Sequence, residues 1–98
     1  MSGPTTPPPD DGRLPDVMQF PMDFPIKIMG KRVDSFADAV VAVVRAHAPA
    51  FDPATLEMRA SRNGNYLSLT ATIRAESRPQ LDALYQELSR HPLVTLVL

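Results

Sequence analysis

Hydrophobic and polar residues alternate over residues 56–74, in two runs separated by Asn63-Gly64. An alternation with a period of two is typical of β-strands that bury one face. Asn-Gly between two such runs predicts a hairpin with a two-residue type I′ turn, because that turn needs positive φ at both central residues. A β-hairpin is therefore the best specified element of the chain.

The position of this turn determines which residues face each other across the hairpin. Every apolar residue of the first run then faces an apolar residue of the second, and a shift of one residue would bury the polar face instead. We expect helices over the apolar face, and water or a partner on the polar face. The predicted apolar pairs are Leu56 with Ala71, Met58 with Leu69 and Ala60 with Leu67.

Upstream of the hairpin, the pattern predicts a strand and then a helix. Apolar residues alternate with others over residues 24–29, and Pro25, which cannot donate to a ladder, suits only the start of a strand. After a turn, Ser35 and Asp38 resemble a capping box, and apolar residues follow at helical spacing. A helix is therefore expected over residues 35–47.

Downstream of the hairpin, Ser77 is the expected N-cap of a second helix, with Gln80 at its third position and Pro92 ending it. Residues 93–98 are apolar on both faces and predict a last strand at a sheet edge. With right-handed crossovers, this order predicts an α+β, ferredoxin-like βαββαβ fold. Its four-stranded antiparallel sheet has the order 4-1-3-2, with both helices on one face.

Residues 1–19 contain five prolines and three aspartates. So few apolar residues cannot repay the entropy of ordering a segment. We expect a disordered, proline-rich tail over residues 1–19 and a single folded domain over residues 20–98.

Composition narrows the classes of function. The net charge of −1 and the pI near 6.0 lack the basic character of nucleic-acid-binding domains, so no nucleic acid is expected. Cysteine is absent, which excludes disulfides and removes the commonest zinc ligand. The chain shows neither a signal-peptide pattern nor about 18 consecutive apolar residues, so we expect a cytoplasmic protein with no membrane contact.

The two histidines are the first candidates for acid–base or metal chemistry. His47 and His91 each fall in the last turn of a predicted helix, where a donor side chain complements the carbonyl end. No second ligand lies at metal spacing on the same helix face, so we expect structural histidines, no metal site and no cofactor.

The turn after the first strand, Gly30-Lys31-Arg32, is a candidate site for an anion or a small ligand. Its glycine allows close approach, two cations flank it, and the following helix offers free N–H groups. A single glycine is not a phosphate-binding fingerprint, and an ordinary turn with solvated cations is the alternative.

The hairpin tip and the polar face beside it form a second candidate site. Arginine and tyrosine are enriched among interface anchors. RNA-binding sheets place two or three aromatics on their central strands, whereas one occurs here. The candidate contact residues are Arg59, Arg62, Asn63, Asn65 and Tyr66, with Lys27 on the same face.

Two enzyme or carrier classes that use this fold can be compared with the chain. A heavy-metal carrier needs paired cysteines, which are absent. An acylphosphatase-type hydrolase needs an arginine and an asparagine around a phosphate; Arg32 with Asn63 or Asn65 has the right residue types, but turn geometry already accounts for the asparagines. A regulatory module needs only a loop and an exposed face or edge.

Several short motifs occur in order from about residue 20 to the end: residues 20–30 (FPMDFPIKIMG), 61–68 (SRNGNYLS), 80–81 (QL), 84–85 (LY) and 91–94 (HPLV). They resemble the YbeD family of small bacterial proteins, a family of unknown function. The resemblance implies a fold similar to the ACT-type regulatory domain and a link to lipoate metabolism. It carries over no catalytic residues.

ACT-like domains bind amino acids between domains, near the turn after the first strand. The resemblance places such a site at residues 29–32 and implies a second copy, for which the apolar last strand offers an edge. We interpret the chain as a non-enzymatic regulatory or adaptor module for a protein partner, a second copy or a small ligand. The alternative is an acylphosphatase-like hydrolase that uses Arg32, and nucleic-acid binding is a weaker third hypothesis.

Overall fold

The structure is a computed structural model that describes residues 19–98. Apart from Gln19, the tail expected at residues 1–19 lies outside the described residues. In chain order, the elements are β1 (Met22–Lys31), α1 (Phe36–His47), the 3-10 helix η1 (Pro53–Thr55), β2 (Glu57–Ala60), β3 (Tyr66–Ala75), α2 (Arg78–Arg90) and β4 (Val94–Val97).

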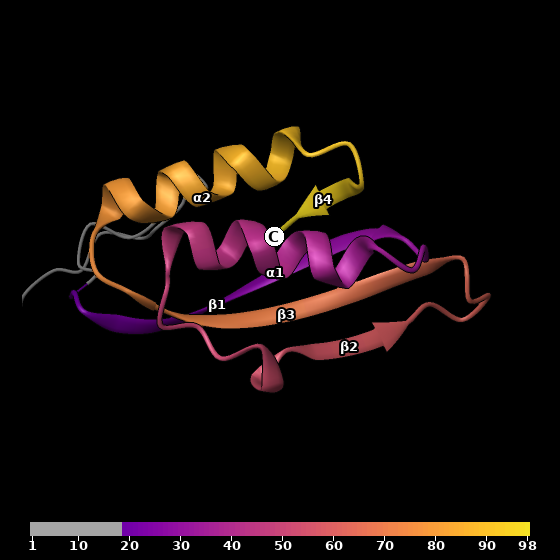
Figure 1. The fold of residues 1–98 in the computed structure, drawn as a ribbon, viewed down its shortest axis with the longest axis horizontal. Coiled ribbons are helices and arrows are strands. Elements are labelled where there is room, and N and C mark those ends of the chain that lie inside the picture. The colour runs from indigo at the N-terminus through magenta and orange to yellow at the C-terminus, as the bar shows by residue number, and fades with distance from the viewer. Residues whose placement is uncertain (1–18) are drawn as a thin grey trace, which may run out of the picture.

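The four strands form one antiparallel sheet in the order β2-β3-β1-β4. Both helices lie on the same face of this sheet (Figure 1). The predicted ferredoxin-like fold, its strand order and the edge position of the last strand are therefore confirmed. The first and last strands of the chain are neighbours in the sheet, because β1 lies between β3 and β4.

The core fills the space between the sheet and the two helices. Phe36 at the start of α1 is its largest fully buried side chain, and the alternating residues of β1 and β3 meet the helical stripes as the pattern predicts. The other large, fully buried side chains are Ile26, Ile28, Val40, Val44, Leu69, Ile73, Leu81, Leu84 and Leu88.

The two helix starts differ in how they are capped. The Ser77 hydroxyl accepts a hydrogen bond from the Gln80 N–H at 3.3 Å, as expected for an N-cap. The Gln80 side chain also donates to the His47 carbonyl at 2.9 Å, which ties the start of α2 to the end of α1. Ser35 precedes α1 but forms no side-chain cap, so the predicted capping box there is wrong.

The hairpin has the predicted register, with Met58 opposite Leu69 and Ala60 opposite Leu67. The predicted type I′ turn is wrong. Gly64 has φ of 75°, but Asn63 does not have positive φ. The Gly64 N–H instead bonds to the Ser61 carbonyl at 2.9 Å, so a four-residue loop reverses the chain.

The outer strand β2 is exposed along its whole length, although its apolar residues were predicted to lie under the helices. Met58 shares the helix-facing side of the sheet with Leu69, yet 61% of its surface is exposed, whereas Leu69 is fully buried. The reason is tertiary, because the helices cover the inner strands and leave the β2 edge open.

Strand β1 is longer than predicted and has Pro25 inside it rather than at its start. Lys27 and Leu98 exchange two backbone hydrogen bonds, of 3.2 and 2.8 Å, so the backbone N–H and C=O groups of odd-numbered β1 residues point toward β4. The backbone nitrogen of Pro25 points the same way, but beyond the end of β4 (Val94–Val97), where the sheet needs no hydrogen-bond donor.

Candidate functional site

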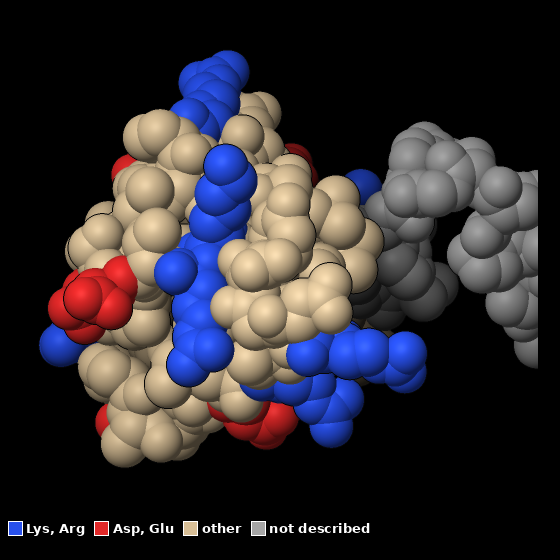
Figure 2. Space-filling view, turned by 90° about the vertical axis from the view of Figure 1, so that its right-hand side faces the viewer, with Lys and Arg blue, Asp and Glu red and all other residues tan. Residues whose placement is uncertain are grey.

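The turn after β1 and the hairpin tip lie side by side at one end of the sheet (Figure 1). We call residues 31–33 and 62–66 the loop end. The Arg32 N–H donates to the Asn65 carbonyl at 3.0 Å, and Lys31 is paired with Tyr66 across β1 and β3. Figure 2 looks onto this end and shows a band of lysine and arginine side chains down its middle, with acidic groups toward its margins.

The loop end contains a shallow hollow of about 440 Å³. Four predicted contact residues and two that the sequence did not single out line it together. Val33 carries no chemical group that would mark it, although it is 41% exposed, and Gly64 was identified only as a turn residue. The lining residues are Lys31, Arg32, Val33, Gly64, Asn65 and Tyr66.

Gly64 brings the Arg32 side chain close to the hairpin. A methyl group at residue 64 would lie 3.3 Å from a guanidinium nitrogen of Arg32, so the guanidinium sits against the backbone of this glycine. The positive φ of residue 64 and the close approach of the Arg32 guanidinium thus both favour glycine at this position. The arrangement holds one cation directly at the hollow.

Gly30 has a structural role. It is buried on the helix-facing side of β1, and an added Cβ would lie 2.6 Å from Cε1 of Phe36 and closer still to the Leu93 carbonyl oxygen. The space left by its missing side chain is therefore filled by the protein itself. Gly30 stays outside the site that we propose below.

The backbone amides of the β1–α1 turn are largely engaged. The Arg32 N–H bonds to Asn65, the Val33 N–H bonds to the Lys31 carbonyl at 2.9 Å, and the Phe36 N–H bonds to the Val33 carbonyl at 3.1 Å. A phosphate cradle built from successive free N–H groups would need these donors. An anion at this turn would therefore bind to the side chains of Lys31 and Arg32 rather than to backbone N–H groups.

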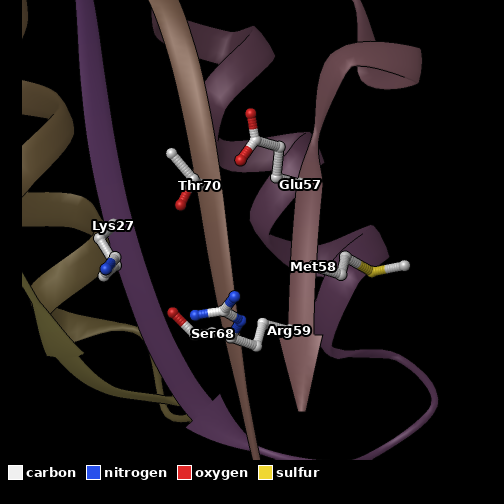
Figure 3. A pocket seen from close by; sticks show the side chains of 6 residues that line it. All are labelled: Lys27, Glu57, Met58, Arg59, Ser68 and Thr70. Atoms are coloured by element: carbon white, nitrogen blue, oxygen red, sulfur yellow. The ribbon is translucent and has the colours of Figure 1, made fainter.

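The second hollow, of about 320 Å³, lies in the middle of the uncovered sheet surface. Arg59 lies here with Lys27, which the sequence placed on the same face, and Figure 3 shows the Arg59 guanidinium reaching across β3 toward Ser68. Arg62 and Asn63 line neither hollow. The residues that line this second hollow are Lys27, Glu57, Met58, Arg59, Ser68 and Thr70.

Both histidines make contacts within the fold, although not with the helix-end carbonyls that the sequence suggested. His47 Nε2 lies 2.6 Å from Glu87 Oε1 and joins α1 to α2, and His91 Nδ1 accepts a hydrogen bond from the Leu93 N–H at 3.1 Å. Among residues 19–98, no three His, Cys, Asp or Glu side chains are grouped to hold a metal ion. None of the helices in this part of the chain is long and apolar enough to cross a membrane.

Tyr85 connects α2 to β1 and to Leu98, the residue after β4. Its ring packs edge-on against Phe24 with the centroids 6.5 Å apart, and its hydroxyl donates to the Leu98 carbonyl at 3.3 Å. Burial raises the pKa of this phenol above its usual range. The hydroxyl, which is protonated at neutral pH as in any tyrosine, acts as a structural donor.

Solved structures that share this fold include the following two. Protein HP0495 from H. pylori superposes with a TM-score of 0.70 at 16% identity, covering 96% of this chain and 98% of that chain. The ACT domain of GTP pyrophosphokinase from Chlorobium tepidum superposes with a TM-score of 0.59 at 18% identity, covering 78% and 84%. At these identities the likeness concerns the fold alone.

Sequence relatives are much closer. A UPF0250 protein of Nitrosomonas europaea is 57% identical over 82 residues, covering 84% of this chain and 94% of the relative. A UPF0250 protein of Ralstonia nicotianae is 48% identical over 95 residues, covering 97% and 93%. The family described as "Protein of unknown function (DUF493)" matches residues 15–98. The resemblance read from the motifs is thus confirmed, and the chain belongs to the DUF493 family of small bacterial proteins.

Proposed function

We propose that this chain is a non-enzymatic binding module that holds an anionic group of a protein partner or a small ligand at the loop end. The observation that carries the proposal is the hydrogen bond from Arg32 to Asn65, which joins two loops that are distant in sequence around one hollow. Two cations line this hollow, and its lining contains no acidic residue. An arginine can bind a carboxylate or a phosphate with two parallel hydrogen bonds.

The side chains of the loop end suit recognition better than chemical catalysis. Tyr66 is 41% exposed and presents a hydroxyl and a ring beside the cations. Tyrosine and arginine together are common anchors of binding sites. A regulatory role and a link to lipoate metabolism are suggested by the family resemblance. The ligand titration described next includes lipoate and amino acids for this reason.

Replacing Arg32 with alanine is expected to weaken anion binding about tenfold, because a hydrogen-bonded charge contributes about 1.5–3 kcal/mol. The measurement is a titration of the ¹⁵N-labelled chain with inorganic phosphate, then with lipoate and with amino acids, followed by amide chemical shifts. Saturable shifts are expected at residues 31–33 and 63–66.

The matched control is Arg45→Ala, which removes an exposed arginine from the last turn of α1. This variant should bind as the wild type does. Shifts that do not saturate, or that persist unchanged in a folded Arg32→Ala chain, would contradict the loop-end site.

A second copy is the protein partner that the β4 edge suits. The Leu98 N–H bonds to Lys27, so the backbone of Val97 faces away from β1 and is available to another strand. Val97→Pro removes this outward donor and should convert a dimer into a monomer in sedimentation velocity. Val97→Ala also removes the valine side chain but keeps the backbone N–H, and this variant should remain dimeric. A wild-type sedimentation profile for folded Val97→Pro would rule out the edge.

The acylphosphatase-like alternative has weaker support. Arg32 and Asn65 do line one hollow, but three amides of the adjoining turn already donate to backbone carbonyls. An enzyme of that type needs donors aimed at the phosphate. We therefore give preference to the binding module.

A further inference from the structure

The sheet surface opposite the helices has a regular arrangement of side chains, which we call the open face. Three rows run across the strands, each defined by paired Cα positions. The first is Glu57, Thr70, Lys27 and Leu98; the second is Arg59, Ser68, Met29 and Leu96; the third is Ser61, Tyr66 and Lys31.

The middle row changes in character from one sheet edge to the other. It begins with the Arg59 guanidinium on β2, passes the Ser68 hydroxyl, and ends with Met29 and Leu96 on β1 and β4. Leu96 is 46% exposed, which is a large apolar surface to leave in water. The open face is thus apolar along β4, whereas its cations lie on the two strands β1 and β2, with Lys27 and Lys31 on β1 and Arg59 on β2.

Positive charge is concentrated on this face. Asp23 and Arg74 neutralise each other at one end, with Arg74 Nη1 3.3 Å from Asp23 Oδ1. Within residues 19–98, Lys27 and Arg59 form no ion pair, and Glu57 is the carboxylate of their hollow. The two helices, by contrast, carry three cations and three carboxylates: Arg45, Arg78 and Arg90, and Asp38, Asp82 and Glu87.

From this gradient we infer that the open face docks an acidic amphipathic helix of another protein. Neighbouring strands lie about 4.8 Å apart, so β4 to β2 spans roughly 14 Å, close to the 10–12 Å width of a helix with its side chains. The apolar side of such a helix covers Met29 and Leu96. Its carboxylates meet Lys27 and Arg59.

Other occupants fit this surface less well. A second copy that used the same face would bring together two surfaces that each carry three cations and one carboxylate in these rows, so that repulsion would exceed attraction. Single-stranded RNA needs two or three stacking aromatics, and the open face has Tyr66 alone among its three rows. An acidic partner with an apolar side matches both the apolar residues along β4 and the cations of the open face.

The inference goes beyond the loop end and can be tested apart from it. The probe is a fluorescein-labelled 18-residue peptide with leucine on one helical face and glutamate on the other. Its binding to the full chain is followed by fluorescence polarisation. One control peptide has lysine in place of glutamate, and another has the same composition in scrambled order.

Lys27→Glu/Arg59→Glu should weaken binding of the glutamate peptide at least about tenfold, since each substitution turns an attraction into a repulsion. Leu96→Gln should weaken it about threefold by removing apolar contact. Glu57→Gln should strengthen it about twofold, because it removes the one carboxylate of the hollow. This opposite sign is hard to obtain from a general loss of folding.

One variant outside the open face serves as the control. Arg45→Glu makes on α1 the charge change of each single substitution and should leave binding within about twofold. Equal binding of the lysine or scrambled peptide, or an affinity unchanged in Lys27→Glu/Arg59→Glu, would overturn the inference. A U12 RNA that binds more tightly than the peptide through Lys27 and Arg59 would overturn it in favour of nucleic acid.

Discussion

Phe36→Ala is expected to lower the free energy of unfolding by about 4 kcal/mol, within the range of about 3–5 kcal/mol for a buried phenylalanine. The ring is fully buried between the start of α1 and β1, and it lies directly beneath Gly30. Removing the ring leaves a cavity between β1 and the start of α1. Neither element can move far enough to fill it, because each is held by its own hydrogen bonds.

The measurement for Phe36→Ala is urea unfolding at 25 °C, followed by circular dichroism. Tyr66→Ala is the matched control, because it removes an aromatic ring that is 41% exposed. We expect it to cost less than about 1 kcal/mol. A loss below that figure for Phe36→Ala would show that the ring is not part of the core.

Gly30→Ala is expected to cost about 3 kcal/mol, the upper part of the usual range for overpacking. The new methyl group would meet the Leu93 carbonyl and the Phe36 ring, and the first of these is backbone that cannot rotate away. For a domain of this size the loss corresponds to a fall in Tm of about 15 °C. Differential scanning calorimetry measures it directly.

Gly64→Ala provides the comparison for Gly30→Ala. Residue 64 has φ of 75° but meets only the end of the flexible Arg32 side chain, so we expect a cost of about 1 kcal/mol. A second check is the pair Gly30→Ala with Phe36→Leu, which should cost less than the sum of the two single changes, since the smaller side chain yields space. Equal costs for the two glycine variants would argue against the packing role of Gly30.

Reasoning from the sequence was most successful where neighbours along the chain decide the structure. The hairpin register follows from alternation around one loop, and the cap at Ser77 follows from Gln80 three residues later. The type I′ turn was wrong for a related reason. Asn-Gly favours that turn, but the loop closes through a Ser61–Gly64 bond instead, and only glycine takes positive φ.

Reasoning about the candidate site was less complete. The sequence supplied Lys31, Arg32 and Tyr66, and it placed Arg59 on the same face as Lys27, but it did not show that these two residues line a hollow separate from the one at the hairpin tip. It also interpreted Gly30 as a place where a ligand could approach. Phe36 and Leu93 occupy that space, and no local pattern reveals such a contact.

By itself, the sequence determined the helices and strands, their order, the sheet topology and the faces that the residues of the hairpin and the first strand occupy. These depend on periodicity, caps and turns, which act over a few residues, and on the handedness of the crossovers. Only the tertiary structure decided that the β1–α1 turn and the hairpin tip share one hollow, that β2 lies beyond the cover of the helices, and that one cation-rich, half-apolar surface spans four strands. Each of these depends on how distant segments pack together, and packing distances are not encoded in any single stretch of the chain.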